Sequence, residues 1–272
     1  MEISLNESIV LFDVDGTITE PRKIISNKMV KLLSTLSKRV DIGFLTGSDI
    51  EYVKQQLWPA FNNKNIRENS RIFTCNGTES YFVNSDCAYE LISKVSMRDK
   101  LGNDNVNKIY KEILLLQADS IGDIISHNLS MTGHFFQDRG STINWCPIGR
   151  NATHSEREKF VEFDKHSGFR TGLLKELKMS LSGVGLGSDI VTVKLGGDTS
   201  FDIFPTGWDK TYVFNHFADD TEIWFVGDRC KEDGNDYEIF NALKHTGRAF
   251  EVSGPEETEE VTFFNILRRF DK

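Results

Sequence analysis

The 272-residue sequence has little of what marks a nucleic-acid-binding, secreted or membrane-spanning protein. Its 41 acidic residues outnumber 32 Lys and Arg, which gives a formal net charge of −9, whereas nucleic-acid-binding proteins are typically basic. The opening residues, MEISLNESIV, contain no basic segment followed by an apolar one, so we expect no signal peptide. No apolar stretch approaches the roughly 20 residues that span a bilayer. We therefore expect a cytoplasmic protein that binds neither nucleic acid nor membrane.

The sequence also lacks the cysteine and histidine spacings of a metal motif or a redox motif. Cys75, Cys87, Cys146 and Cys230 are scattered with no C-x-x-C pair, and the six histidines form no pair at metal-binding spacing. Such cysteines are typical of free thiols in a reducing compartment. We expect no disulfide framework.

What is present is an ordinary globular composition, with 39% hydrophobic and 27% charged residues. The first part of the chain alternates strand-like and helical patterns. The apolar run Ser8–Phe12 stops at a polar residue, as a buried parallel strand does, and Ser26 is a suitable N-cap for a helix with apolar residues at helical spacing. Further strands are expected at 40–45 and 71–75. Repeated units of this kind predict a doubly wound α/β layer with a parallel sheet.

The pattern changes after about residue 86 and resumes near Pro205. Between these points we expect an α+β unit with antiparallel strands at 133–136, 141–146, 190–195 and 200–204. Its expected helices are one at 108–116, one that begins at a capping box at Ser155, and one at 171–181. A helix at 208–217 and a strand at 222–226 then complete the first layer. We predict a catalytic core domain made of residues 1–86 and 206–272, with residues 87–205 inserted as a cap.

Three expected strands each deliver a polar residue at their carboxyl end: Asp13, Thr46 and Asp228. Ligands of open parallel sheets bind at this edge, so the three side chains are expected to converge. Phosphoryl transfer needs a nucleophile, a metal, fixed cations and a group that handles a proton. The sequence offers a candidate for each of these parts.

Asp13 is the candidate nucleophile, because a carboxylate can form an aspartyl phosphate. Asp15, across a turn opened by Gly16, is the candidate general acid and base. Mg²⁺ prefers oxygen ligands. The remaining assignments are Asp13, Asp15 and Asp228 as metal ligands, Thr46 and Lys210 as contacts of the phosphoryl oxygens, and Asn235 and Asp236 as outer or additional metal-binding residues.

The motifs Asp13-Val14-Asp15-Gly16-Thr17, Thr46-Gly47-Ser48, Lys210 and Gly227-Asp228…Asn235-Asp236 resemble the four motifs of the haloacid dehalogenase (HAD) superfamily. This resemblance implies a Rossmann-like HAD core with an inserted α+β cap. The longer strings FDVDGT-x-T-x-PR, NW-x-PIGR, SFDIFP-x-GWDK and GD…GNDYEIF closely resemble the eukaryotic-type phosphomannomutase family, from about residue 8 to residue 254.

Membership of that family implies interconversion of mannose 6-phosphate and mannose 1-phosphate for GDP-mannose synthesis, with glucose phosphates as possible further substrates. The reaction would use an aspartyl phosphate, Mg²⁺ and a hexose 1,6-bisphosphate that serves as activator and intermediate. A homodimer joined through the cap is also implied. Carried over position by position, the substrate-binding residues are Arg22, Arg139, Arg150, Arg157, Ser200 and Asp202. Arginine suits this role because its guanidinium matches phosphate geometry.

The chain departs from the family pattern at Cys75, Gln137 and Ala242, where the family usually has acidic residues. A secondary cation site near Ala242 is therefore not expected. Two other functions stay open from the sequence: a sugar-phosphate phosphatase of the same superfamily, and a non-catalytic phosphosugar-binding protein. Retention of the carboxylates and the lysine of the four motifs favours an enzyme.

Overall fold

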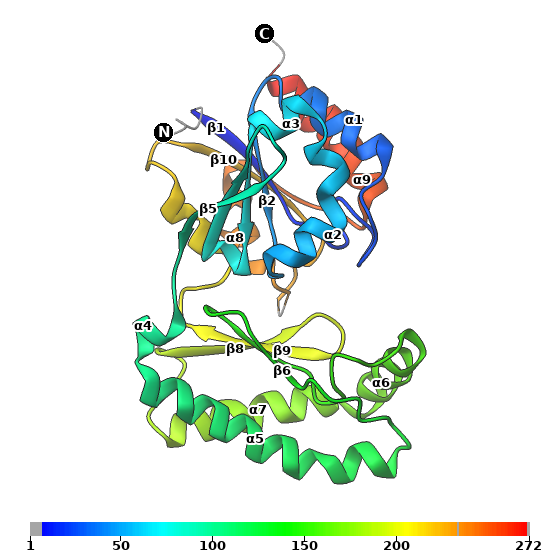
Figure 1. Cartoon of the computed structure of the whole chain (residues 1–272), viewed down its shortest axis with the longest axis vertical. Helices are drawn as coiled ribbons and strands as arrows, with labels where there is room; N and C mark the ends of the chain where they lie inside the picture. The colour runs from blue at the N-terminus through cyan, green and yellow to red at the C-terminus, as the bar shows by residue number, and fades with distance from the viewer. Residues whose placement is uncertain (1–6, 233, 271–272) are drawn as a thin grey trace. The chain divides into compact units, whose positions relative to one another are not determined.

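The structure, a computed structural model, describes residues 7–232 and 234–270. The chain divides into two compact units, which we call the core unit (Met1–Lys94 and Trp208–Lys272) and the inserted unit (Val95–Gly207) (Figure 1). The sequence placed these boundaries after residues 86 and 205. The first boundary lies later in the structure because a strand of the core sheet, β5 (Tyr89–Lys94), follows residue 86.

The core unit is built on a seven-stranded sheet in the order β11-β10-β1-β2-β3-β4-β5. Strands β11, β10, β1, β2 and β3 run parallel, whereas β4 and β5 are antiparallel to their neighbours. The bounds of the remaining strands are β1 Ser8–Phe12, β2 Asp41–Leu45, β3 Ser70–Thr74, β4 Glu79–Val83, β10 Glu222–Gly227 and β11 Ala249–Glu251. The predicted α/β class with a mainly parallel sheet is confirmed, and the β4–β5 hairpin at its edge was not predicted.

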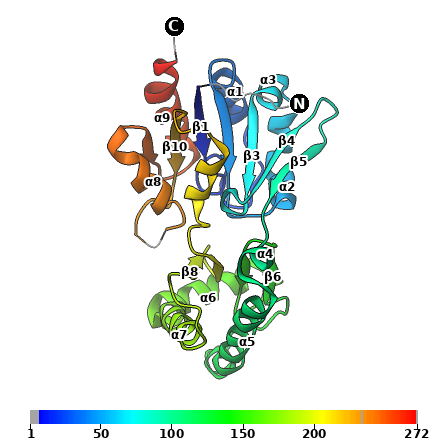
Figure 2. The ribbon, with the colours of Figure 1, turned by 90° about the vertical axis from the view of Figure 1, so that its left-hand side faces the viewer.

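Helices cover both faces of this sheet (Figure 2). Alternate residues of β1 show the division: Val10 and Phe12 pack in one apolar cluster, Ile9 and Leu11 in the other. The first cluster includes buried residues of α1 (Asn27–Leu36), α2 (Ile50–Phe61) and α3 (Lys64–Glu68), and the second those of α8 (Tyr237–Leu243). Burial on both faces explains why the strands read as continuous apolar runs.

Short helical turns connect several of these elements. The 3₁₀ turns are Cys75–Gly77, Lys210–His216, Lys244–Thr246 and Leu267–Arg269, while α9 (Pro255–Val261) leads into a π-helical turn at Thr262–Ile266. The helix expected at 208–217 is therefore a 3₁₀ helix. It begins where the side chain of Asp209 accepts a hydrogen bond from the backbone N–H of Thr211 (2.9 Å).

The inserted unit packs a four-stranded antiparallel sheet, in the order β6-β7-β9-β8, with helices. The helix beginning near residue 154 is capped by Thr153 with Glu156, so the capping box predicted at Ser155 is wrong by two residues. The real box works because the Thr153 hydroxyl and the Glu156 carboxylate each satisfy a backbone N–H. The elements are α4 Met97–Leu101, α5 Asn103–Ser126, β6 Phe136–Asp138, β7 Ile143–Trp145, α6 His154–Ser167, α7 Phe169–Gly183, β8 Val191–Gly196 and β9 Ser200–Pro205.

Residues on the strands of the inserted unit alternate between an apolar and a polar face. Ile143, Ile203 and Val193 lie opposite one another in register and are buried. The neighbouring row contains only polar residues, namely Gln137, Asn144, Asp202 and Lys194. Trp145 connects the apolar face to α5, since its indole N–H donates to Gln117 Oε1 at 2.6 Å.

Among the described residues, no helix is long and apolar enough to cross a membrane.

Candidate active site

A tight turn after β1 brings the first site residue to the edge of the core sheet. Asp13 continues the strand by donating its backbone N–H to Val226 O of β10 (2.9 Å), and Gly16 N–H then closes the turn on Thr19 O (2.8 Å). Gly16 has a φ of +83°, and a Cβ built there would lie 2.3 Å from Asp228 Oδ2. Only glycine permits both that conformation and that approach. The D-x-D-G pattern therefore places two strand ends in contact.

Lys210 is fully buried between two carboxylates. Its Nζ donates to Asp13 Oδ1 and to Asp236 Oδ1. Asp236 is also completely buried, and its second oxygen accepts the backbone N–H of Arg229 at 3.1 Å. A buried ammonium of this kind is tolerated because it is paired and hydrogen-bonded on both sides.

The charges around Asp13 shift several pKa values. Burial raises the pKa of Asp13 well above 3.8, with Asp236 and Asp228 adding to the rise and Lys210 opposing it. Burial and the charge of Asp236 also raise the pKa of Asp228 above 3.8. For Lys210 burial alone would lower the pKa, but Asp13 and Asp236 outweigh it, so its pKa is raised. The site thus holds more negative charge than one lysine compensates, and a further cation would relieve it.

The donor set fits a hard divalent cation. Asp13, Asp228 and Asp236 each offer a carboxylate oxygen, and these oxygens lie within 4.8 Å of one another. Asp228 Oδ1 is buried and has no hydrogen-bond partner among the described residues. An orphaned carboxylate oxygen beside two others is the arrangement that Mg²⁺ or another oxygen-seeking cation satisfies.

Asp15 lies apart from that carboxylate cluster. Its Oδ1 accepts two hydrogen bonds, from the backbone N–H of Arg22 (2.8 Å) and from Gln56 Nε2 (2.7 Å). Gln56 lies on α2 and is buried, and it was not among the sequence candidates. No helix was predicted around Gln56, so no signal in the sequence indicated its contact with Asp15. The two carboxylates of the turn therefore have different environments, since Asp13 contacts a lysine and Asp15 contacts amide donors.

Thr46 directly follows β2 and is buried. Its hydroxyl accepts the backbone N–H of Ser48 (3.1 Å), while its carbonyl accepts that of Asn76 (2.9 Å). Asn76 adopts a φ of +62° in the turn that begins at Cys75. Asn235, next to Asp236, has a buried Oδ1 with no partner among the described residues. These placements bring the core candidates to the carboxyl ends of β1, β2 and β10.

The remaining candidates, except Arg22, belong to the inserted unit and form a network around Asn144. Asn144 Nδ2 donates to Asp202 Oδ1 (2.7 Å) and Ser200 Oγ (3.0 Å), while its Oδ1 accepts Arg150 Nη1. Arg139 Nη1 lies 3.9 Å from Asp202 Oδ1. Asn144 was missed as a site residue, although it opens the NW-x-PIGR string. The polar row of this sheet thus gathers cationic, amide and hydroxyl groups on one face.

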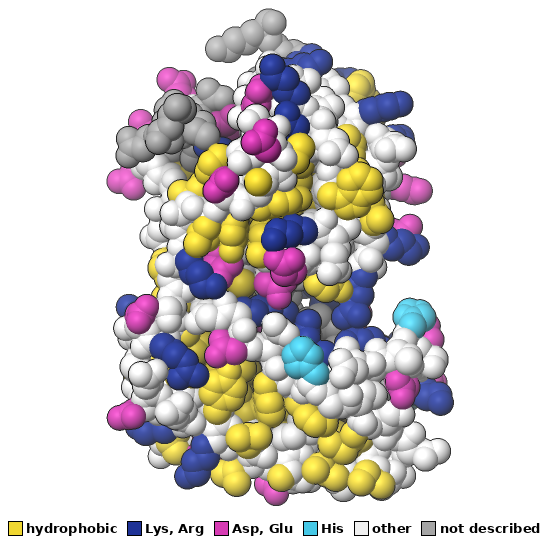
Figure 3. All heavy atoms as spheres, in the orientation of Figure 1, with side chains coloured by type: hydrophobic (Ala, Val, Ile, Leu, Met, Phe, Trp, Pro, Cys, Tyr) yellow, Lys and Arg dark blue, Asp and Glu magenta, His cyan; other side chains and the backbone are white. Residues whose placement is uncertain are grey.

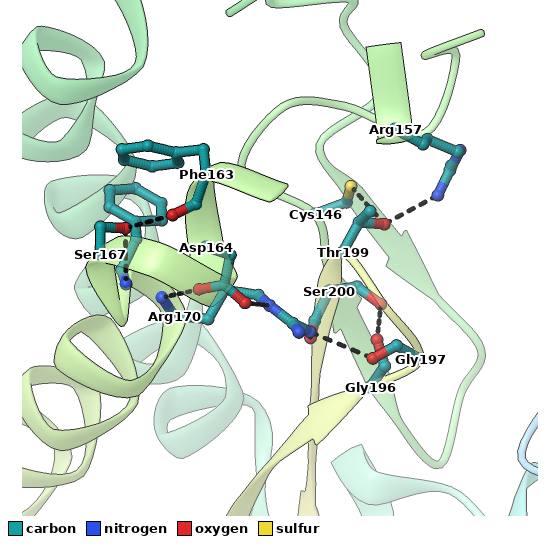
Figure 4. Close-up of polar contacts among 11 residues, drawn as sticks. Cys146, Arg157, Phe163, Asp164, Ser167, Arg170, Gly196, Gly197, Thr199 and Ser200 are labelled. Atoms are coloured by element: carbon teal, nitrogen blue, oxygen red, sulfur yellow. Dashed lines mark hydrogen bonds and ion pairs between the residues drawn. The ribbon is translucent and has the colours of Figure 1, made fainter. Parts of the chain in front are cut away.

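Arg157 lies nearby and contacts the turn between β8 and β9. Its Nη1 donates to Thr199 Oγ1 at 2.7 Å (Figure 4), and its Nη2 donates to Arg150 O at 3.1 Å. Of the departures from the family pattern, Gln137 lies on β6 opposite Asn144, and Ala242 is exposed on α8. The site residues predicted from the sequence therefore form two groups, one in each unit.

The chain is similar along most of its length to one family of known proteins. The model of the family described as eukaryotic phosphomannomutase matches residues 29–268. Phosphomannomutase 1 of Dictyostelium discoideum is 37% identical over 254 residues, covering 93% of this chain and 94% of its own length. The phosphomannomutases of Dendrobium officinale and Saccharomyces cerevisiae are each 35% identical, with 96% of this chain and 95% of theirs aligned.

Solved structures show the same fold at low identity. The N-terminally truncated IMP-nucleotidase of Plasmodium falciparum has a TM-score of 0.62 at 16% identity, covering 94% of this chain and 69% of that one. Trehalose-6-phosphate phosphatase of Aspergillus fumigatus has a TM-score of 0.53 at 15% identity, covering 95% and 92%. These neighbours agree with a Rossmann-like HAD core, and the near-complete match to the family model settles the family. The chain belongs to the eukaryotic phosphomannomutase family.

Proposed function

We propose that this chain is a phosphomannomutase that interconverts mannose 6-phosphate and mannose 1-phosphate. The observation that carries the proposal is the similarity to phosphomannomutases at 35–37% identity along almost the whole chain. The structure supports it with two differently placed carboxylates on one turn, Asp13 and Asp15. We further propose that the product supplies GDP-mannose synthesis, that glucose phosphates are also accepted, and that the protein acts in the cytoplasm, where its free cysteines would stay reduced.

In this proposal Asp13 carries the phosphoryl group. A carboxylate oxygen of Asp13 bonds to phosphorus as the bond from phosphorus to the donor's oxygen breaks, and a hexose 1,6-bisphosphate supplies the first phosphoryl group. Lys210 would hold Asp13 in place and offset part of the negative charge that gathers during transfer. Mg²⁺, held by Asp13 and Asp228 with Asp236 beside them, would neutralise phosphate charge.

Asp15 would manage the proton at the sugar oxygen. When phospho-Asp13 donates to a free hydroxyl of a mannose phosphate, Asp15 takes the proton of that hydroxyl, and the product is a bisphosphate. When Asp13 accepts the other phosphate, Asp15 returns the proton to the departing oxygen. The hydrogen bonds from Arg22 N–H and Gln56 to Oδ1 would orient the carboxylate for both steps.

The inserted unit would bind the phosphate and sugar that are not reacting. Arg139, Arg150 and Arg157 are the proposed cationic contacts of this unit, with Ser200 and Asp202 for sugar hydroxyls. Arg22 of the core unit is also a proposed substrate contact. Asn144 contacts Arg150, Ser200 and Asp202, so it would hold these groups in register. A substrate that presents either end to Asp13 needs such a second phosphate site.

We also propose a homodimer joined through the inserted unit. Leu114, Leu115 and Ile125 of α5 are each more than half exposed, and Figure 3 shows apolar side chains along the lower edge of the view, where Figure 1 draws α5. Exposed apolar groups of this kind are typical of association surfaces. Size-exclusion chromatography with light scattering, on the wild type and on Leu114→Glu, tests this part.

The activity itself is tested with purified protein, Mg²⁺, glucose 1,6-bisphosphate and mannose 1-phosphate. The mannose 6-phosphate formed is converted by added isomerases to glucose 6-phosphate, whose oxidation by NADP⁺ is followed. Isomerisation that requires the bisphosphate is the expected result. Release of phosphate without isomerisation would identify a phosphatase instead, and ligand binding without either reaction would identify a non-catalytic protein.

A further inference from the structure

The turn that joins β8 to β9 directly precedes two of the proposed substrate-binding residues, Ser200 and Asp202. Gly196 and Ser200 face each other at the base of this turn, and Asp202 lies two residues further along β9. Gly197 has a φ of +55°, and a Cβ on Gly196 would lie 2.6 Å from Asp202 Oδ2. A turn of this composition has many accessible conformations when nothing restrains it. The position of Ser200 therefore depends on what holds the turn.

Arg170, near the start of α7, contacts this turn directly. Its Nη1 donates to two backbone carbonyls, Gly197 O at 3.1 Å and Ser200 O at 3.4 Å. One cationic nitrogen thus bridges both ends of the turn. A dashed line in Figure 4 marks the bond from Arg170 to Gly197. Charge-assisted hydrogen bonds of this kind are stronger than neutral ones. Arg170 was not among the sequence candidates.

The arginine side chain is itself fixed before it reaches the turn. Asp164 of α6 accepts its backbone N–H on Oδ1 and its Nε–H on Oδ2, both at 2.7 Å (Figure 4). The side chains of Asp164 and Arg170 are only 13% and 11% exposed. Because one carboxylate holds both the backbone and the guanidinium, few rotamers remain to be lost when Nη1 contacts the turn. The ion pair therefore preorganises Arg170.

The corner from which Arg170 extends is also rigid. Gly168 joins α6 to α7 in the left-handed conformation, with a φ of +67°, and donates its N–H to Asp164 O at 2.8 Å. The rings of Phe160, Phe163 and Phe169 pack against one another beneath it. A packed aromatic cluster resists displacement. The helix corner can thus serve as a fixed support for the turn.

We propose that Arg170 is a positioning residue for substrate binding. Held by Asp164, it fixes the β8–β9 turn and so keeps Ser200 and Asp202 in position to bind the substrate. Arg157 holds the same turn from its other side through Thr199, which leaves the intervening residues little freedom. This inference rests on the proposed function, because Ser200 and Asp202 matter to catalysis only if they contact the sugar phosphate.

The test compares Arg170→Gln with the wild type in the full chain. The substitution removes the charge and the double contact, so we expect KM for mannose 1-phosphate to rise about tenfold, the equivalent of one charge-assisted hydrogen bond. The value of kcat at saturation should stay within about twofold, since no reacting atom is touched. Hydrogen exchange of the amides at 197–200 should become faster. Arg170→Lys and Asp164→Asn should show intermediate effects and replace Arg170→Gln if that variant does not fold.

A matched control separates positioning from general stability. Ser180 of α7 donates to Glu112 of α5, a half-buried contact in the same unit that does not involve the turn. We expect Ser180→Ala to lower Tm without changing KM or exchange at 197–200. Unchanged KM and unchanged exchange in Arg170→Gln, or an equal rise of KM in Ser180→Ala, would overturn the inference. Absence of isomerisation by the wild type would instead contradict the proposed function, and exchange at the turn would still report whether Arg170 holds it.

Discussion

Asp13 and Lys210 lie 197 residues apart in the sequence and form a buried ion pair. Asp236 contacts the same ammonium from the other side. The arrangement joins the first strand of the core unit to the segment that re-enters it after the inserted unit. If Asp13 is the nucleophile, as proposed, this one lysine contacts the reacting carboxylate and also stabilises the folded core.

Replacement of Asp13 by Asn should abolish turnover and leave the fold intact. An amide oxygen cannot form the covalent phosphoryl intermediate, so we expect a loss of at least about a thousandfold in kcat. Because burial raises the pKa of Asp13 despite the opposing charge of Lys210, a neutral side chain of the same shape should not lower Tm. Steady-state kinetics and thermal unfolding check both parts. Asp219→Asn, at an exposed carboxylate of the same unit, is the control that should change neither.

Replacement of Lys210 by Met should destabilise the protein as well as inactivate it. Removing the cation leaves Asp13 and Asp236 buried and uncompensated, which costs about 3–5 kcal/mol for a buried pair. Urea denaturation measures the free energy of unfolding. The control is Lys28→Met, because Lys28 pairs with Glu259 at the surface and is 79% exposed, so its loss should change the free energy of unfolding far less. Equal effects of the two substitutions would argue against the buried arrangement.

Mg²⁺ should stabilise the folded chain even without substrate. A cation that binds the folded state only raises the free energy of unfolding with its concentration. We expect millimolar-range Mg²⁺, on the order of 1 mM, to raise Tm, and Asp228→Asn to abolish most of this rise because it removes the unpartnered oxygen. Chelation with EDTA should remove the activity of the wild type. An identical Tm response in Asp228→Asn would place the metal elsewhere.

His216 should make stability sensitive to mild acid. Its Nε2 donates to Gly77 O at 2.7 Å, and the rings of Phe73 and Tyr212 pack beside it. Burial lowers the pKa of His216 below 6.5, and the hydrogen bond to Gly77 O opposes this only in part. The unfolded chain therefore takes up the proton at a higher pH than the folded one. The contribution of His216 is complete above pH 6.5 and is lost as the pH falls below that value.

Urea denaturation at about pH 7.5 and about pH 5.5, on either side of the ordinary histidine pKa, measures this effect. The wild type should lose more stability between the two than His216→Gln does. His245→Gln, at an exposed position, should behave like the wild type. A pH response that persists unchanged in His216→Gln would assign it to other groups.

The core strands and their terminal site residues were predictable because each strand reads as an apolar run that stops at a polar residue. Asp13, Thr46 and Asp228 follow β1, β2 and β10. The hairpin of β4 and β5 was not predicted, since Tyr89–Lys94 has polar and exposed residues and no apolar run. Edge strands are half solvated and carry a weaker signal.

Contacts between side chains on different elements were the least predictable part of the site. Nothing in the local pattern around Gln56 shows that its amide contacts Asp15, and Arg170 resembles any arginine in the first turn of a helix. Their partners lie 41 and up to 30 residues away. The Thr153 cap was misplaced for a different reason, since Ser155 with Glu158 offers the same residue types two positions later.

The measurement that tests the central proposal most directly follows isomerisation and phosphate release side by side. Mannose 1-phosphate is supplied with Mg²⁺ and glucose 1,6-bisphosphate, and mannose 6-phosphate and inorganic phosphate are measured in the same reaction. The account predicts that mannose 6-phosphate forms much faster than free phosphate, only with the bisphosphate present, and not at all in Asp13→Asn. Rapid phosphate release with no mannose 6-phosphate would contradict it.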